Sequence, residues 1–323
     1  MGLLIEGQWH DQWYDTDSND GEFVRTDAQF RNWVTAEGSS DFPAESGRYH
    51  LFVSLACPWA HRTLIFRKLK QLEDVIGVTV VKPEMLDKGW ELLPQDDAAA
   101  MDTSPIANIR YLYEVYTATQ SDYSGRVTVP ILWDKKTHTI VNNESAEIIR
   151  MLNSAFDAFT DVKTDYHPEP LHPRIDEINE LVYDNINNGV YKAGFATTQH
   201  AYEKAFDALF KALDHVEGTL GQQRYLAGDQ MTEADWRLFT TLIRFDSVYF
   251  GHFKTNLRRI EDYPNLSNYL RELYQVEGIA DTVNFDHIKT HYYYSHDTIN
   301  PTRVVPVGPE LDYNRPHNRD RFF

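Results

Sequence analysis

Apolar and polar positions in the first half of the chain alternate between strand-like and helix-like runs. RYHLFVSL (48–55) and VIGVTVVKP (75–83) are mostly apolar and β-branched, which is typical of buried strands. Between them, AHRTLIFRKLKQLE (60–73) repeats apolar residues at helical spacing and predicts an amphipathic helix. Its apolar side holds Leu64, Ile65, Leu69 and Leu72, and its other sides hold Arg62, Arg67, Lys68 and Lys70.

A hairpin and another helix follow in the pattern. RVTVPILWD (126–134) and HTIVN (138–142) have the composition of strands, and the short KKT between them predicts a hairpin. NESAEIIRMLNSAF (143–156) has helical apolar spacing and starts at Asn143 or Glu144. These runs predict two antiparallel strands followed by a helix.

The order of these elements predicts the fold class. Helical spacing of Tyr and Leu within residues 84–125 completes the series strand, helix, strand, helix, strand, strand, helix. That layout is an α/β thioredoxin-like domain, which we assign to residues 46–156. Residues 1–45 are polar and aromatic with scattered Gly and Pro, and predict an extension of loops packed on the body. Prolines in residues 157–173 predict a linker to an all-α domain over residues 174–323.

The second half of the chain has apolar spacings typical of helices. MTEADWRLFTTLIRF (231–245) begins with Thr232 and Asp235, a variant of the capping box. About the last forty residues, with HYYYSHDTINP and DYNRPHNRDRFF, are aromatic and predict an irregular tail wrapped over the body. The predicted helices cover residues 174–188, 200–220, 232–248 and 264–275.

Composition narrows the class of protein. The chain has 323 residues, 42% hydrophobic and 13% aromatic, which fits an ordered globular protein with two domains. The net charge of -18 argues against a nucleic-acid partner, because phosphate contacts need clustered Lys and Arg. No apolar run is long enough to cross a bilayer, and the N-terminus lacks the pattern of a signal peptide. We therefore expect no membrane partner. A single cysteine cannot form an internal disulfide, which fits a reducing compartment, so we expect a cytoplasmic protein.

That cysteine, Cys57, stands in SLACPWAHR where the predicted strand gives way to the predicted helix. Pro58 suits the first position of a helix, so the thiol faces backbone N–H groups and the positive end of the helix dipole. Both favour thiolate, and we expect the thiol pKa to lie below its ordinary value of about 8.5. His61 and Arg62, one turn along, add positive potential.

The position of a second cysteine in a Cys-x-x-Cys motif is occupied by Ala60. A mixed disulfide on Cys57 must therefore be cleared by an external thiol, and glutathione is abundant in the cytoplasm. The alternative is a buried structural cysteine, which is the common fate of a lone cysteine. The strand–Cys–Pro–helix setting favours a reactive thiol.

A second feature also fits glutathione. VTVP places Val129 before Pro130, and in thioredoxin-like proteins this proline is cis and leaves the preceding backbone groups to a peptide-like ligand. The helix start at Glu144-Ser145 suits the γ-glutamyl carboxylate, and the Glu144 carboxylate suits the ligand's ammonium group. The alternative is that VTVP is an edge strand and that Glu144-Ser145 only caps a helix.

Several segments of the sequence resemble those of a known family. RYLAGDQMTEADWRLF resembles the signature of the helical second domain of glutathione transferases, here of the cysteine type. More narrowly, six segments resemble the glutathionyl-hydroquinone reductases, or Xi-class glutathione transferases: SLACPWAHRTLI, SGRVTVPILWD, NESAEIIRM, NNGVYKAGFAT, NFDHIKTHYYYSH and TINPT. The resemblance covers nearly the whole chain. It implies a homodimeric enzyme that reduces glutathionyl-hydroquinones with glutathione, through a mixed disulfide on its cysteine.

The resemblance also implies roles for individual residues. Cys57 would be the nucleophile, and Tyr191 would donate the proton that the departing aromatic carbon or a ring oxygen requires. Tyr249 and Tyr292 would lower the thiol pKa by hydrogen bonding toward its sulfur. The residues that would bind glutathione are Trp90, Arg126, Val127, Thr128, Val129, Glu144 and Ser145.

Alternatives remain at this stage. His287 and His291 have a spacing that suits a metal on a helix, but no Glu-x-x-His accompanies them, so we predict no metal. His61 is expected to pack or hydrogen-bond locally. A second enzymatic hypothesis is a broader omega-like thiol transferase or dehydroascorbate reductase, which shares Cys57 and differs in the need for Tyr191. A third is a non-catalytic glutathione-fold binding protein, which an intact Cys-Pro disfavours.

Overall fold

The computed structural model describes residues 2–322, which form two compact units. Each unit has its own apolar core and is built from three separate segments of the chain. Unit 1 consists of the residues up to Trp13 together with Thr26–Thr164 and Thr282–His291. Unit 2 consists of Tyr14–Arg25, Asp165–Asp281 and the residues from Tyr292 onward.

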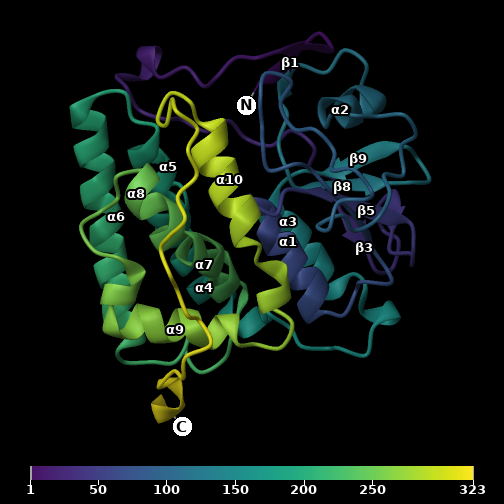
Figure 1. The fold of residues 1–323 in the computed structure, drawn as a ribbon. Coiled ribbons are helices and arrows are strands. Elements are labelled where there is room, and N and C mark those ends of the chain that lie inside the picture. The colour runs from purple at the N-terminus through teal and green to yellow at the C-terminus, as the bar shows by residue number, and fades with distance from the viewer. Residues whose placement is uncertain (1, 323) are drawn as a thin grey trace. The chain divides into compact units, whose positions relative to one another are not determined.

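Unit 1 is built around a four-stranded sheet with the strand order β6-β5-β8-β9 (Figure 1). β5 (Tyr49–Val53) pairs in parallel with β6 (Gly77–Val80) and antiparallel with β8 (Ile131–Asp134). β9 (Thr139–Asn142) pairs antiparallel with β8, which confirms the predicted hairpin. All five residues of β5 are buried, as expected for a central strand covered on both faces.

Three helices complete the predicted order of this unit. They are α1 (Pro58–Leu69), α2 (Tyr113–Thr119) and α3 (Ser145–Ser154), and α1 packs against α3. Glu144 is the N-cap of α3, which decides between the two predicted starting residues. The order strand, helix, strand, helix, strand, strand, helix is confirmed.

Arg62 and Lys70 lie off the apolar side of the predicted helix and are nevertheless buried. Both are 1% exposed. Lys70 Nζ donates to Thr164 O at 2.9 Å, and Arg62 Nη1 donates to Ser145 Oγ at 3.3 Å. A buried cation is tolerated where such partners exist, and the apolar periodicity of the helix carries no information about them.

The N-terminal extension, predicted as loops, contains short strands. β1 (Leu3–Ile5) pairs antiparallel with both β2 (Gln8–His10) and β7 (Gly125–Arg126). β3 (Val34–Thr35) and β4 (Phe42–Pro43) form a parallel pair. Strands of two or three residues are too short to show an alternating pattern, which explains why the prediction missed them.

Unit 2 is all-helical, and the predicted helices are confirmed with ends that differ by a few residues. α7 opens with the capping box of Thr232 and Asp235. Two helices continue directly into π-helical turns, at Tyr183–Asn187 after α4 and at Phe245–Tyr249 after α7. Such turns are rare and are frequent at functional sites. The helices are α4 (His172–Val182), α5 (Gly189–Gly194), α6 (Gln199–Leu220), α7 (Glu233–Arg244), α8 (Phe250–His252) and α9 (Pro264–Tyr274).

The C-terminal stretch, predicted as irregular, begins with the helix α10 (Phe285–Ser295). Its mixture of histidine, tyrosine and charged residues has no distinct apolar stripe, so the pattern did not predict a helix. Residues beyond it are mostly irregular, but Arg319 is fully buried and donates to backbone carbonyls at and just after the end of α6. The 3-10 helices are Asp17–Asn19, Asp157–Phe159, Glu169–Leu171, Ile260–Asp262, Ala280–Thr282 and Arg319–Phe322.

Within residues 2–322, no helix combines the length and the apolar character that a membrane crossing requires.

Candidate active site

Cys57 lies at the junction that the sequence predicts. Its backbone is extended, with φ -76° and ψ 123°, and it is the N-cap of α1, with Pro58 at the first helical position. The first helical hydrogen bond runs from His61 N to Cys57 O at 3.0 Å. Cys57 is partly exposed. A thiol in this place faces the N-terminal backbone of the helix, where the dipole favours a negative charge.

The residue across from the thiol is Val129. The Val129-Pro130 peptide bond is cis, and Cys57 Sγ donates to Val129 O at 3.8 Å. The preceding Thr128 is bonded internally, because its N–H donates to Tyr116 Oη and its C=O accepts from the same hydroxyl. Of the predicted segment 126–129, Val129 is therefore the residue whose backbone adjoins the thiol.

Arg126 and Val127 of the same segment point elsewhere. The Arg126 guanidinium donates to the carbonyls of Gln12 and Trp13, so it ties the N-terminal extension to β7. The Val127 side chain is buried in the core at 1% exposure. These contacts give both residues a structural function in holding the segment that carries Val129.

The predicted pair at the start of α3 is held by its own hydrogen bonds. Glu144 Oε1 accepts from Ala146 N at 3.0 Å and so caps the helix. Ser145 Oγ accepts from Arg62 of α1, and the Arg62 guanidinium also lies 4.6 Å from the ring centroid of Trp59. A buried cation thus lies next to a helix N-terminus, and both favour binding of an anionic group such as a carboxylate.

Trp90 is buried at 3% exposure and stacks on His291, with ring centroids 4.7 Å apart. His291 Nδ1 lies 3.0 Å from Pro83 O. Among residues 2–322, no group accepts a hydrogen bond from the Trp90 indole N–H. A buried donor without an acceptor costs free energy, so a ligand that supplies an acceptor would bind favourably here.

His61 packs in the interior, as one of its two predicted roles requires. It is fully buried, and its Nε2 lies 2.7 Å from Thr282 Oγ1, a residue 221 positions away. The hydrogen bond to Thr282 satisfies a polar atom of a buried side chain with a partner from a distant segment.

In unit 2, three tyrosines from different helices come together. Tyr292 Oη lies 2.5 Å from Tyr191 Oη and 3.0 Å from Tyr249 Oη. Tyr191 belongs to α5, Tyr249 ends the second π-helical turn, and Tyr292 belongs to α10. Burial raises the pKa of Tyr292 well above its ordinary value of 10, and the neighbouring Tyr191 and Tyr249 add to this rise. The sequence prediction made Tyr191 the proton donor and gave Tyr249 and Tyr292 a separate role toward the thiol. The structure brings the hydroxyls of all three into one hydrogen-bonded chain.

The run of three tyrosines in α10 divides by position on the helix. Tyr292 is 1% exposed and joins the hydroxyl chain. Tyr293 packs against His252, and Tyr294 lies under the guanidinium of Arg303. Only the first of the three is therefore positioned to act with Tyr191.

Sequence reasoning missed the residues that surround Tyr191. Phe23, Phe195 and Phe253 pack around its ring at centroid distances of 5.6 to 6.3 Å. The Arg25 guanidinium lies 5.1 Å from the same ring centroid. Phe23 and Arg25 come from the N-terminal extension, where no periodicity marks them, and only an aromatic-rich composition hinted at packing.

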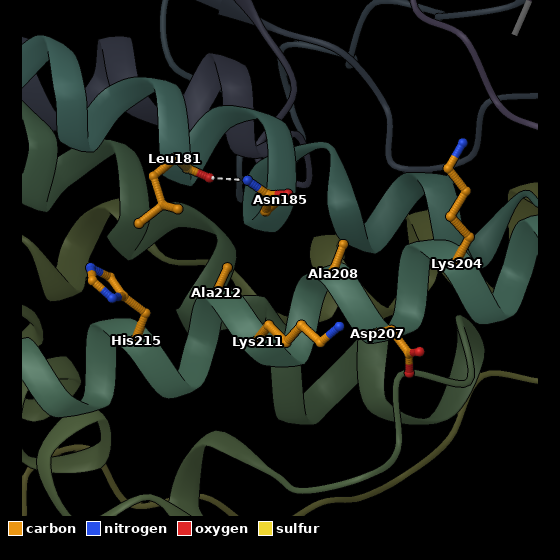
Figure 2. Close-up of a pocket in the computed structure, with 8 residues that line it drawn as sticks. All are labelled: Leu181, Asn185, Lys204, Asp207, Ala208, Lys211, Ala212 and His215. Atoms are coloured by element: carbon orange, nitrogen blue, oxygen red, sulfur yellow. Dashed lines mark hydrogen bonds between the residues drawn. The ribbon is translucent and has the colours of Figure 1, made fainter.

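A surface groove and a cluster of metal-ligating side chains are two other kinds of possible site, and neither is found at the predicted site residues. Figure 2 shows a surface groove between α4 and α6, whose lining includes none of the predicted site residues. Within residues 2–322 there is no group of three or more His, Cys, Asp or Glu side chains placed to hold a metal ion. The residues that line the groove are Leu181, Asn185, Lys204, Asp207, Ala208, Lys211, Ala212 and His215.

Comparison with known proteins identifies the family. Residues 56–155 match the glutathione S-transferase N-terminal domain, and residues 199–272 match the glutathione S-transferase C-terminal domain. The chain is 56% identical to glutathionyl-hydroquinone reductase YqjG of Escherichia coli, over 99% of each chain. It is 54% identical to glutathionyl-hydroquinone reductase PcpF of Sphingobium chlorophenolicum, over 96% of each chain.

Solved structures agree with these matches. The glutathione-bound structure of YqjG has a TM-score of 0.90, with 53% identity and full coverage of both chains. The Xi-class glutathione transferase of Natrialba magadii has a TM-score of 0.92, with 47% identity over 99% of this chain and 97% of that one. The predicted fold class, a thioredoxin-like N-terminal domain with a helical C-terminal domain, is confirmed. The chain belongs to the glutathionyl-hydroquinone reductases, the Xi-class glutathione transferases.

Proposed function

We propose that this protein reduces glutathionyl-hydroquinones to hydroquinones with glutathione as the reductant, and that Cys57 is the nucleophile. The observation that carries the proposal is a partly exposed thiol at the N-cap of α1 with alanine at the position of a resolving cysteine. Such a thiol forms a mixed disulfide that only an external thiol can reduce. The names of the two reductases that share more than half of its residues support the substrate class.

Glutathione fits three features of unit 1. The backbone of Val129 beside the cis-proline suits the cysteinyl peptide group, which would bring the glutathione sulfur to Cys57. The N-terminus of α3, with Ser145 and the buried Arg62, suits the γ-glutamyl carboxylate. The Trp90 indole N–H suits an oxygen of the tripeptide. The glutathione-bound structure of the E. coli relative supports glutathione as the ligand.

The first step transfers glutathione from carbon to the protein. The Cys57 thiolate attacks the glutathione sulfur, an S–S bond forms, and the bond between that sulfur and the aromatic carbon breaks. The electron pair of the broken bond stays with the aromatic ring, which takes up one proton and leaves as the hydroquinone. The ring is thereby reduced and the two sulfurs are oxidised to a disulfide.

Tyr191 is the proton donor in this step. Either oxygen can be the donor in each of the two hydrogen bonds. In the direction that the proposed role of Tyr191 requires, Tyr249 donates to Tyr292 and Tyr292 donates to Tyr191. In that arrangement the hydrogen of Tyr191 remains available to the substrate, and the phenolate left behind accepts a hydrogen bond from Tyr292. Hydrogen bonds to the charged form stabilise it, so this arrangement favours release of the Tyr191 proton to the substrate.

The second step restores the enzyme. A second glutathione, as its thiolate, attacks the mixed disulfide, and the products are oxidised glutathione and the Cys57 thiolate. The predicted hydrogen bonds from Tyr249 and Tyr292 toward the Cys57 sulfur would use the same hydroxyl hydrogens, so they are an alternative to the hydroxyl chain and not a second role beside it. We further propose that residues 46–156 bind glutathione, that residues 157–173 link them to the helical residues 174–323, and that the enzyme is a cytoplasmic homodimer, as the family resemblance implies.

The test is turnover of glutathionyl-menadiol in the presence of glutathione, measured as the amounts of menadiol and oxidised glutathione released. The proposal predicts equal amounts of both products from the wild type and none from Cys57→Ser. Substantial turnover by Cys57→Ser would refute the nucleophile assignment. If the wild type reduces only simple mixed disulfides or dehydroascorbate, the broader thiol-transferase hypothesis replaces this one. If it binds glutathione without reducing any of these substrates, it is a non-catalytic binding protein.

A further inference from the structure

The segment Tyr14–Arg25 brings one cation to the face of Tyr191. The Arg25 guanidinium carbon lies 5.1 Å from the centroid of the Tyr191 ring and 5.4 Å from that of Phe23. Arg25 Nε donates to Asn188 Oδ1 at 3.0 Å. Asn188 is buried and is the N-cap of α5, the helix that carries Tyr191. The hydrogen bond therefore fixes the guanidinium to the same turn of chain that fixes the ring.

A cation over a phenol ring acts differently on the two protonation states. With the neutral phenol it makes a cation–π contact of about 1 kcal/mol. With the phenolate it makes a charge–charge contact, which is stronger at the same distance because a full charge replaces a quadrupole. The difference favours loss of the phenol proton.

Other charged and titratable groups near Tyr191 make different contacts. The Tyr292 hydroxyl bonds to Tyr191 Oη, and Tyr249 contacts its ring. Lys192 is its neighbour in sequence, but Lys192 Nζ donates to Asp184 O. The remaining ring neighbours described above are phenylalanines.

Arg244 is the other cation of this cluster. It acts on Tyr292, where it opposes the rise in pKa, and its Nη1 donates to Thr240 O within its own helix. Arg25, in contrast, directly faces the Tyr191 ring.

We propose that Arg25 is a positioning residue for proton transfer, which holds its charge over Tyr191 and stabilises the phenolate that forms when Tyr191 protonates the departing hydroquinone carbon. The inference rests on the proposed role of Tyr191. It predicts that the N-terminal extension takes part in the chemistry specific to aryl thioethers, and that reduction of simple mixed disulfides does not need it.

The experiment compares Arg25→Gln, which removes the charge, with Arg25→Lys, which keeps it. Each purified variant is assayed with glutathionyl-menadiol and with a small glutathione mixed disulfide, whose thiolate leaving group needs no carbon protonation. For Arg25→Gln we expect a loss of about five- to tenfold in kcat on glutathionyl-menadiol and little change on the mixed disulfide. We expect Arg25→Lys to lose less on glutathionyl-menadiol than Arg25→Gln.

A matched control is Arg258→Gln, which removes another arginine of unit 2 that lies over a tyrosine ring, at 4.7 Å from Tyr263. It should not change the ratio of the two activities. A folding defect lowers both activities together, so equal losses in Arg25→Gln would overturn the proposal. An unchanged activity ratio, or equal ratios in Arg25→Gln and Arg25→Lys, would also overturn it.

A second readout needs no turnover. Ultraviolet absorbance of tyrosinate is titrated in the wild type, Tyr191→Phe, Arg25→Gln and the double variant, and the Tyr191 contribution is obtained by difference. The proposal predicts that this contribution appears at higher pH without Arg25, and an unchanged midpoint would overturn it. If the Tyr191 contribution shifts but Tyr191→Phe reduces both substrates as fast as the wild type, the effect of Arg25 stands and the proton-donor role of Tyr191 fails.

Discussion

The hydroxyl oxygens of Tyr191 and Tyr292 lie 2.5 Å apart, although the two residues are separated by 101 positions in the chain. Tyr292 also reaches Tyr249 Oη at 3.0 Å, so the proton of one tyrosine is bonded to the oxygen of the next. Since burial raises the pKa of Tyr292 well above 10, Tyr292 keeps its proton and acts as a donor. A neutral donor of this kind stabilises the phenolate of Tyr191 without supplying a charge itself.

The first prediction concerns the middle of this chain. Tyr292→Phe removes the hydroxyl that bonds to both neighbours and keeps the ring packing. We expect kcat on glutathionyl-menadiol to fall about tenfold, because the Tyr191 phenolate loses its hydrogen bond and the proton transfer becomes less favourable. Tyr249→Phe, which removes the more distant hydroxyl, should cost less.

Tyr294→Phe is the matched control for Tyr292→Phe, because it removes a hydroxyl from the same helix outside the chain. Its activity should equal that of the wild type. The account of the hydroxyl chain is wrong if Tyr292→Phe and Tyr294→Phe have the same rate on glutathionyl-menadiol.

The second prediction concerns glutathione binding by Trp90. Trp90→Phe keeps a ring that stacks on His291 and removes the indole N–H, which has no acceptor within residues 2–322. If a glutathione oxygen accepts this hydrogen bond, its loss raises KM for glutathione about fivefold, as expected for one hydrogen bond, and leaves kcat nearly unchanged.

Trp133→Phe is the control for Trp90→Phe. Trp133 is 1% exposed in β8, and its indole N–H also lacks an acceptor among the described residues. Trp133→Phe should lower stability through lost packing without changing KM for glutathione. A rise in KM with both variants, or with neither, would argue against Trp90 as a ligand contact.

The third prediction concerns a helical glycine beside the tyrosines. A Cβ on Gly194 of α5 would lie 2.2 Å from Phe253 Cγ, and Phe253 is fully buried, so its ring has no room to move away. Gly194→Ala should therefore lower the free energy of unfolding by about 2 kcal/mol. It should also slow turnover, because Phe253 packs on Tyr191.

Gly218→Ala is the matched helical control. A Cβ on Gly218 of α6 would meet nothing within 4 Å, and alanine is the better helix former. Urea unfolding should show Gly218→Ala to be more stable than the wild type by about 0.5 to 1 kcal/mol. Opposite signs for the two substitutions are the expected result, and a stabilised Gly194→Ala would contradict the packing described here.

The fourth prediction concerns the pH dependence of stability. Burial lowers the pKa of His252 from 6.5 to about 4, and its Nε2 lies 3.2 Å from His296 Nδ1. The unfolded state therefore binds a proton at a higher pH than the folded state does. The contribution of His252 to stability is complete above about pH 6.5 and is lost as the pH falls toward 4, by about 3 kcal/mol in total.

Urea unfolding between pH 7 and pH 4.5 measures this effect. The unfolding free energy should fall less steeply with decreasing pH in His252→Gln than in the wild type. In His200→Gln, which removes an exposed histidine of α6, it should fall as steeply as in the wild type. Identical slopes for the wild type and His252→Gln would show that His252 titrates normally in the folded protein.

Much of unit 1 could be predicted because its elements have distinct periodicities. The buried strands β5 and β6 are continuous apolar runs, and Cys57-Pro58 marks the start of α1 through the preference of proline for the first helical position. The burial of Arg62 and Lys70 could not be predicted, because it depends on partners such as Ser145 and Thr164 that only the folded chain brings close.

In unit 2, the three tyrosines could be named from the sequence, but the residues that surround them could not. Tyr191, Tyr249 and Tyr292 were found through resemblance to a family, since nothing in composition separates them from the other tyrosines of the chain. Arg25 stands in an irregular segment, 163 positions from its partner Asn188, and no periodicity connects the two. The helix α10 was missed because its polar and aromatic residues have no apolar stripe, although its first tyrosine completes the hydroxyl chain.

The central claim is that Cys57 takes glutathione from the aromatic carbon. It is tested most directly by mixing the enzyme with glutathionyl-menadiol in the absence of glutathione and measuring the mass of the intact protein together with the menadiol released. We predict one glutathione per chain on Cys57, released menadiol in equal amount, and neither product with Cys57→Ser. Menadiol released without a glutathione adduct on Cys57 would contradict the account.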